Sequence, residues 1–486
     1  MGIRGLLSIL VLFSLPGCLT MSHKEQVKNL MAPPSLEVSV NTSLNTPYFS
    51  KGNFPNDTWW EMFQIKELSS LIEKALSLNP SIQAIKERVN YAKEEVIAKR
   101  SKLYPWVYFN IDDMWSYLSK NGLLKALNPS IPLSVSHIDV TLSSPYEFDF
   151  WDKIRNTYRA AIGREKAEEA EEAEVKLVVT TSLSQTYFFL KTHLLKQALF
   201  GQLYRVRLKL YELEQLLEKN NIQSELAPLS SIERLLQAEQ FLLEIEKLVL
   251  QDKHLINILA GVGPDEPIHA DASFPELKKS ITLPENLSIG LLSRRPDLIA
   301  QIWLVEALSH DVASAKAVFW PQIDLNSFVG IKSLHYSTLF EWISKATEIK
   351  PTLALPVFTA GEIEANLQSK RALYQQAVFE YNDMILKSVK EVADLLAFAN
   401  AVYGEKDKQD GIVAAAKNRY NLTRDRECSG LDSALEKLRY REEVILTQLT
   451  NADFLFGQYA ATIGLIKALG GGYSSEELPI QAKSGV

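Results

Sequence analysis

The chain has 486 residues, of which 46% are hydrophobic, and its formal net charge is −7 at pH 7. That length and apolar content are ample for several domains with sizeable buried cores. The negative balance, with Lys and Arg spread along the chain rather than gathered on one face, argues against nucleic acid as a partner.

The N-terminus has the layout of an export signal. Arg4 supplies a short positive region, residues 6–15 form an apolar core, and a Leu-Pro-Gly-Cys sequence ends at Cys18. The apolar core is too short to span a bilayer as a helix, so we predict a cleaved signal peptide over residues 1–17. The ending resembles a bacterial lipobox, which predicts lipidation of Cys18 as the new first residue. An ordinary signal peptide with an incidental cysteine is the alternative.

Short helices are expected after a polar leader. Residues 18–58 are rich in Ser, Asn, Pro and Thr, which predicts an extended tether behind the lipid. Trp59 opens a helical pattern that stops at Asn79-Pro80, and a second helix follows to about Leu103, before Pro105.

Beyond Pro105 the apolar residues recur at every second position, which predicts strands with one apolar and one polar face. The expected strands cover residues 106–115, 137–145, 321–331 and 348–357. A strand of a soluble sandwich has the same local pattern, but Asp and Asn recur on the polar faces, as the wall of a water-filled barrel requires. So few strands cannot close a barrel alone, and an open sheet would leave exposed edges, so we expect several chains to contribute.

Each strand pair precedes a long helical hairpin. The expected helices cover residues 152–217, 229–260, 361–425 and 431–469. The first contains no proline, and along one seam its residues alternate between spacings of three and four, as in a coiled coil: Ala170, Ala173, Leu177, Thr180, Ser184 and Tyr187. At about 1.5 Å per residue it would extend roughly 100 Å, a length that suits a spacer or a conduit.

The same arrangement occurs twice in the chain. Residues 79–84 align with residues 295–300, and at that offset of 216 positions Tyr104-Pro105 meets Trp320-Pro321 without a gap. Such self-similarity indicates duplication. We therefore predict a first repeat over residues 59–270, a second over 271–475 and a C-terminal tail over 476–486.

With these motifs in order, the chain resembles the TolC-type outer-membrane factor family, in particular its lipoprotein branch typified by OprM and NodT. The resemblance covers residues 59–473. The motifs that carry it stand at Tyr146–Trp151, Leu291–Leu298, Ala315–Pro321, Pro356–Gly361 and Leu465–Gly472. Asp152 departs from the family's pattern, because a glycine is common at that position.

The resemblance implies a fold that is mainly α with a β-barrel portion, built from two repeats that each contain a β-hairpin and a long antiparallel helical hairpin. It implies a homotrimer with one β-barrel in the outer membrane of a Gram-negative cell and an α-barrel in the periplasm. Such a protein is the passive exit duct of a tripartite efflux pump or a type I secretion system. Its partners are outer-membrane lipid, a periplasmic adaptor and an inner-membrane transporter, and it needs no cofactor.

The resemblance also places a periplasmic gate at the turn of the second helical hairpin. Leu435 falls at the position of a hydrophobic ring across the threefold axis, with Asp432 in the turn beside it. One turn after Leu435 stands Arg439, where related channels have an Asp. If Arg439 faces inward, three copies form a basic ring that favours anions, and if it faces outward they do not. Residues 421–429 contain Cys428 and read as a polar insertion where the adaptor docks.

A periplasmic adaptor or a structural coiled-coil lipoprotein is the alternative, since either combines lipidation with helical hairpins. That alternative predicts one helical hairpin and soluble β domains. This sequence instead predicts two helical hairpins, and strands whose polar faces suit the lumen of a barrel. We expect no enzyme, because the sequence contains no nucleophile elbow, no phosphate loop and no metal-ligand spacing among its seven histidines. Arg294–Asp297 is interpreted as a helix start and Gly470–Gly472 as a helix stop.

Overall fold

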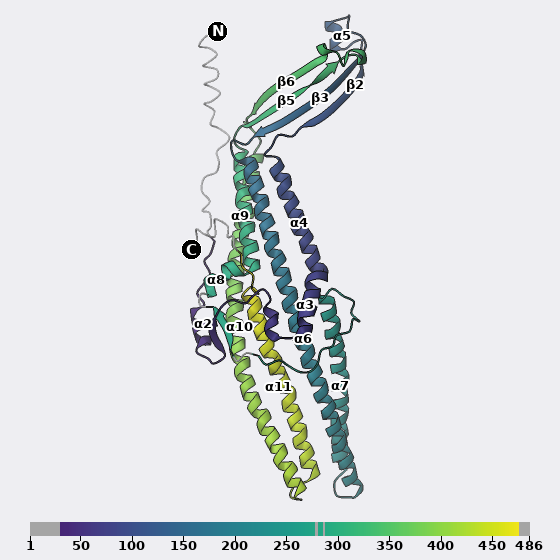
Figure 1. Cartoon of the computed structure of the whole chain (residues 1–486), viewed down its shortest axis with the longest axis vertical. Coiled ribbons are helices and arrows are strands. Elements are labelled where there is room, and N and C mark those ends of the chain that lie inside the picture. Colours follow the sequence, from purple (N-terminus) through teal and green to yellow (C-terminus); the bar gives the residue numbers. More distant parts are fainter. Residues whose placement is uncertain (1–29, 278–279, 285–286, 476–486) are drawn as a thin grey trace. The chain divides into compact units, whose positions relative to one another are not determined.

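The computed structural model describes residues 30–277, 280–284 and 287–475 of the chain (Figure 1). The predicted signal peptide, Cys18 and the predicted tail over residues 476–486 lie outside the described residues. The described part divides into two compact units, one built from residues 90–166 and 303–379 and the other from residues 30–89, 167–302 and 380–475. Each unit therefore takes segments from both halves of the chain.

The first unit contains a four-stranded antiparallel sheet. Its strands lie in the order β2-β3-β5-β6 (Figure 1), with bounds β2 (Tyr108–Tyr117), β3 (Ser134–Phe148), β5 (Gln322–Ser333) and β6 (Lys345–Ala354). The central pairing joins the two halves of the chain, because Val140 of β3 lies opposite Ile331 of β5. β2 and β6 are the edges, so the sheet of a single chain is open.

The helices that precede the two strand pairs match in length and start. α4 (Pro80–Ser101) and α9 (Pro296–Ala317) contain 22 residues each, and each begins with proline. Proline suits the first helical position, where its missing N–H would have no helical partner. Asn79 caps α4, since its Oδ1 accepts the N–H of Ser81 at 2.9 Å and of Ile82 at 3.3 Å. The offset found in the sequence therefore holds for this pair of helices.

Two long helical hairpins follow the strands. They are α6 (Lys153–Lys219) with α7 (Leu226–Leu259), and α10 (Glu362–Cys428) with α11 (Ala434–Ala468). α6 and α10 contain 67 residues each. Within the described ranges, none of the helices combines the length and the apolar character that a membrane span needs. α10 continues to Cys428, three residues past the predicted end at residue 425. Most of the predicted insertion over residues 421–429 is therefore helical and belongs to α10.

The start of α6 explains how the chain tolerates its departure from the family's pattern. Asp152 has a φ of +57°, in the left-handed region that favours glycine. Asp is among the few other residues that adopt this conformation readily. Just upstream, Asp149 caps the helix by accepting the N–H of Ile154 at 2.9 Å and of Arg155 at 2.8 Å. The chain therefore turns from strand to helix without a glycine.

The prediction of an extended tether over residues 18–58 is wrong for the described residues from 30 onward. That segment contains α2 (Glu37–Leu44) and β1 (Phe49–Gly52), and β1 pairs in parallel with β4 (Ile281–Pro284). Leu36, Val40 and Phe49 are buried in a hydrophobic cluster with side chains of α8 (Leu287–Arg294), α10 and α11. Burial of these few apolar residues outweighs the polar, loop-forming composition around them.

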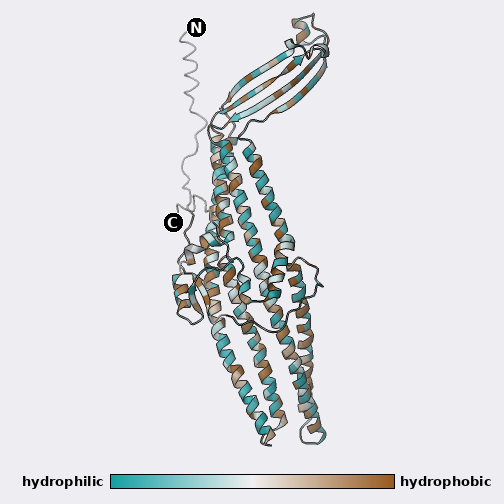
Figure 2. Cartoon of the chain, in the orientation of Figure 1, coloured by the Kyte–Doolittle hydropathy of each residue, from teal (hydrophilic) through white to brown (hydrophobic). Residues whose placement is uncertain are grey.

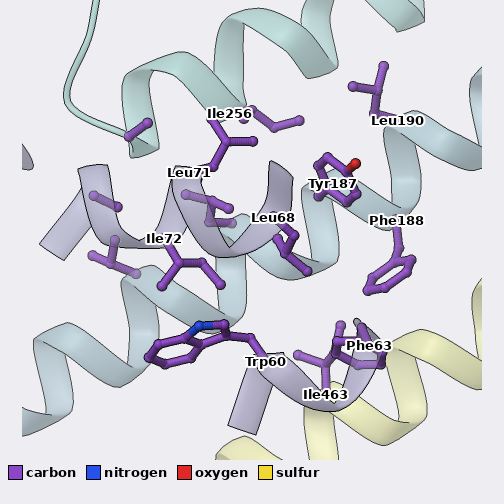
Figure 3. Close-up of a cluster of buried hydrophobic side chains, with 14 of the residues drawn as sticks. Trp60, Phe63, Leu68, Leu71, Ile72, Tyr187, Phe188, Leu190, Ile256 and Ile463 are labelled. Carbon is purple, nitrogen blue, oxygen red and sulfur yellow. The ribbon is translucent and has the colours of Figure 1, made fainter. Parts of the chain in front are cut away.

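The main core of the second unit forms around α3 (Lys66–Leu78) and the short helix η1 (Trp59–Phe63). Figure 3 shows Trp60, Phe63, Leu68 and Ile72 lying beside residues of α6, α7 and α11. Phe188 of α6 stacks on Tyr459 of α11, with ring centroids 4.1 Å apart. Along the long helices, hydrophilic and hydrophobic residues recur in turn (Figure 2), so these helices bury part of their surface and leave part to solvent or to a partner.

Candidate channel wall and gate

One face of the sheet is apolar over most of its area. The register places these residues in line across the strands, because directly opposite residues point to the same side. Phe109 and Ile349 are 64% and 78% exposed in the single chain. The apolar face comprises Phe109, Ile111, Ile138, Val140, Leu142, Ile323, Leu325, Val329, Ile331, Ile349 and Leu353. Ile138 is buried, and the other residues of this face are half-buried or exposed. An apolar face of this kind indicates contact with lipid or another protein surface.

The opposite face of the sheet is polar and charged. Asp112 lies opposite Asp139, which lies opposite Lys332. Lys332 Nζ is 2.8 Å from Asp139 Oδ2, and His137 Nε2 is 2.8 Å from Asp139 Oδ1. The alternation read from the sequence therefore produces two faces of opposite character, which is the property required of a wall between lipid and water.

The second helical hairpin turns at residues 429–433. Gly430 has a φ of +72°, and the Leu431 N–H donates to the Arg426 carbonyl at 2.9 Å, as in a Schellman motif. The Ser433 hydroxyl accepts the Glu436 N–H at 3.2 Å, while the Glu436 carboxylate accepts the Ser433 N–H at 3.4 Å. This capping box starts α11 in a fixed position relative to the turn.

Asp432 is held by its own hairpin. Arg426 donates to both of its carboxylate oxygens, from Nε at 2.7 Å and from Nη2 at 2.9 Å. This bidentate contact lowers the pKa of Asp432 and raises the pKa of Arg426. The residue that sequence reasoning placed in the gate therefore also ties the end of α10 to the turn.

Leu435 and Arg439 both lie against the first helical hairpin of the same chain. Leu435 is half-buried and packs on a hydrophobic cluster contributed by α6, α7 and α11, namely Leu199, Leu203, Val206, Leu210, Ala238, Ile445 and Leu449. Arg439 Nη2 donates to Glu214 Oε1 of α6 at 3.2 Å. Glu214 is buried and also accepts the hydroxyl of Ser231 on α7. Three helices therefore meet at one carboxylate next to the predicted gate.

A second ionic contact in this region was not predicted from the sequence. Arg207 Nε of α6 donates to Glu442 Oε1 of α11 at 2.8 Å, and Arg207 Nη1 donates to the carbonyl of Arg234 on α7 at 2.7 Å. The side chains of Arg207 and Glu442 are only 9% and 10% exposed. On a helical sequence such residues look like ordinary solvated charges, and only the packing of three helices shows that they are buried.

A further charged cluster surrounds the start of α9. Arg295 donates to Asp297 at 2.7 Å and to Glu391 of α10 at 2.7 Å. Asp297 lies in the first turn of α9, so the predicted helix start at Arg294–Asp297 is confirmed. Glu174 of α6 lies near this cluster, and burial, with the negative charge of Asp297, raises its pKa to about 7. Glu174 can therefore change its charge near neutral pH.

The sequence profile of the outer membrane efflux protein family matches residues 71–215 and 289–471 of the chain. The chain belongs to the outer membrane efflux protein family. It is 26% identical over 437 residues to the multidrug resistance outer membrane protein MdtP of Escherichia coli (strain K12), with 88% of this chain and 89% of MdtP covered. It is 27% identical over 475 residues to the probable outer membrane lipoprotein SilC of Salmonella typhimurium, with 96% of this chain and 98% of SilC covered.

Solved structures of this family share the fold. The outer membrane protein VceC of Vibrio cholerae superposes with a TM-score of 0.77 at 27% sequence identity, over 86% of this chain and all of VceC. The predicted resemblance to TolC-type channels and the predicted fold class are therefore confirmed. This outer membrane efflux protein is a channel-type component of the outer membrane, which decides against the alternative of a periplasmic adaptor. Among the residues described, no group of three or more His, Cys, Asp or Glu is arranged to hold a metal ion.

Proposed function

We propose that three copies of this chain form a closed duct through the outer membrane. The sheet carries this proposal: its apolar face is exposed in the single chain, and its edge strands β2 and β6 each have one neighbour. Lipid stabilises the apolar face, but edges at membrane depth need partners for their backbone groups. Pairing β6 of one copy with β2 of the next closes the sheet and turns the charged face toward a water-filled lumen. The number of three copies follows from the resemblance to TolC-type channels.

The duct serves a tripartite efflux pump. MdtP is named a multidrug resistance protein, which supports efflux of small toxic molecules over protein secretion by a type I system. The chain supplies a passive path, and energy comes from an inner-membrane transporter that is connected through a periplasmic adaptor. A lumen lined by Asp112, Asp139 and Lys332 passes hydrated solutes without a specific binding site. These roles require no cofactor and no catalytic residue.

The gate lies at the second hairpin turn. Leu435, Arg439 and Asp432 are its proposed residues, and in the single chain Leu435 and Arg439 pack against the first hairpin. The Arg439–Glu214 contact and the Arg207–Glu442 contact hold α11 against α6. Opening therefore requires that these contacts loosen, so that α10 and α11 can move away from the axis.

The N-terminal residues attach the duct to lipid. SilC, which covers almost the whole chain, is named a probable outer membrane lipoprotein. This supports removal of residues 1–17 and acylation of Cys18. Cys18→Ala abolishes acylation in this proposal while leaving the sheet unchanged, so metabolic labelling with a fatty acid tests it. Label retained by Cys18→Ala contradicts this assignment.

The duct is tested in a Gram-negative strain that lacks its own outer-membrane efflux channel but keeps the adaptor and the transporter. Expression of the full chain restores drug resistance, and the outer-membrane fraction contains a trimer that dissociates to monomer on boiling in detergent. A chain that fractionates as a soluble monomer, or that restores no resistance with any cognate adaptor, refutes the proposal.

A further inference from the structure

The two loops at the end of the sheet remote from the helices expose large apolar side chains. The loop from β2 to β3 contains α5 (Leu123–Leu127), and the loop from β5 to β6 contains η2 (Tyr336–Thr338) and η3 (Trp342–Ser344). Leu123 and Leu127 are each 74% exposed, and Phe340 and Trp342 are 85% and 82% exposed. In the proposed duct this end of the sheet faces the exterior of the cell, where such side chains would contact water. Exposed apolar patches mark surfaces that bind another protein or lipid.

Both loops are held in place by hydrogen bonds. In the first loop, the Leu118 N–H donates to the Leu133 carbonyl at 2.6 Å and Lys125 Nζ donates to the Pro129 carbonyl at 2.6 Å. In the second loop, the Tyr336 hydroxyl donates to Asp113 of β2 at 2.6 Å. The exposed apolar side chains are therefore presented by fixed frames, and little conformational entropy is lost when a partner covers them.

The order of the strands indicates which surface covers these apolar side chains. The first loop leaves the sheet from edge strand β2, and the second enters it at edge strand β6. When the edges of neighbouring copies pair, the β2 loop of one copy comes next to the β6 loop of the adjacent copy. At each junction between copies, on the outer rim formed by these loops, the apolar side chains of one loop then face those of the other.

We propose that the outer rim contains an apolar clasp between copies, in which Leu123, Leu124 and Leu127 of one chain pack against Phe340, Trp342 and Ile343 of its neighbour. The clasp rests on the proposed trimeric duct and adds a contact beyond the paired strand edges. It removes from water apolar side chains that are 53–85% exposed in the single chain. It also makes the contact head-to-tail, because each junction joins two different loops and no loop meets its own counterpart.

Cysteine cross-linking in intact outer membranes tests the clasp. In a Cys428→Ser background, the double variant Leu124→Cys with Ile343→Cys is treated with a short bismaleimide, boiled in detergent and separated by size. The clasp predicts covalent dimers and trimers, with loss of most of the monomer, while each single variant stays monomeric after boiling. The matched control combines Leu124→Cys with Val357→Cys. Val357 is 70% exposed but follows the opposite end of β6, so this pair gives no covalent multimer.

The same samples separate failure of the clasp from failure of the duct. A boiling-sensitive trimer without cross-linked product refutes the clasp and leaves the duct standing, and absence of the trimer refutes both. Lipid is the competing cover for this surface, and Trp342 reports on it in liposomes that contain brominated phospholipid. The difference in fluorescence between the wild type and Trp342→Phe is the emission of Trp342. If the clasp covers Trp342, the brominated lipid does not quench this emission. Quenching of that difference assigns the loop to lipid and overturns the proposal.

Discussion

The buried ion pair between Arg207 and Glu442 offers the sharpest test of how the helical hairpins are held together. Replacing Glu442 by Gln keeps the shape of the side chain but leaves the guanidinium of Arg207 without its opposite charge. Removal of one partner from a buried pair costs about 3–5 kcal/mol in other proteins. Arg207 keeps its hydrogen bond to the Arg234 carbonyl at 2.7 Å, so we expect the lower end of that range, about 3 kcal/mol.

The control is an ion pair on the surface, between a lysine and a glutamate. Lys247 and Glu244 lie 2.6 Å apart on α7, and their side chains are 54% and 57% exposed. Because water solvates both charges, Lys247→Gln changes the free energy of unfolding by less than about 1 kcal/mol. Urea unfolding of the full chain in detergent, followed by helical circular dichroism, compares the two variants. Equal unfolding midpoints for Glu442→Gln, Lys247→Gln and the wild type would falsify the assignment of Arg207–Glu442 as a buried structural contact.

Three more predictions concern pH, packing and conduction. The pKa of Glu174 is raised from 4.5 to about 7 in the folded chain, so folding favours its protonated form. Its contribution to stability is full below pH 4.5, is lost as pH rises from there to about 7 and changes little above that, so melting temperatures measured from pH 5 to pH 8 should fall less in Glu174→Gln than in the wild type. Gly163 lies where a Cβ would come within 2.9 Å of α9, whereas Gly201 has open space; Gly163→Ala should lower the melting temperature, and Gly201→Ala should raise it through an increase of about 1 kcal/mol in helix propensity. Arg439→Asp places a negative charge beside the buried Glu214; in planar bilayers it should shift ion selectivity from anions toward cations, and unchanged selectivity contradicts an inward position for Arg439.

The repeating elements could be predicted from the sequence because their signals are local. Proline at the first position of α4 and α9, and the two-residue period of the strands, are properties of neighbouring residues. The faces of the sheet follow from that period, since a shift of one residue would invert them. The turn of the second hairpin was equally visible, because Gly430 and Ser433 are typical of a helix end and a helix start.

The features that escaped prediction depend on contacts between distant segments. Leu36, Val40 and Phe49 are isolated in a polar stretch, and they are buried by α8, α10 and α11 and by pairing of β1 with β4, all more than 200 residues away. Arg207 and Glu442 are separated by 235 positions. Charged residues on helices are solvated in most settings, so the sequence alone favours the wrong environment for both. A single-chain pattern likewise says nothing about which side of the second hairpin faces the axis of an assembly.

In the proposed duct, neighbouring copies of this chain close the sheet through pairing of β2 with β6. Electron cryo-microscopy of the full-length protein in lipid nanodiscs tests it most directly. We expect threefold particles in which one closed barrel crosses the lipid, with β6 of each copy hydrogen-bonded to β2 of the next and the charged face turned inward. Monomeric particles, or an assembly in which β2 and β6 remain unpaired, would contradict it.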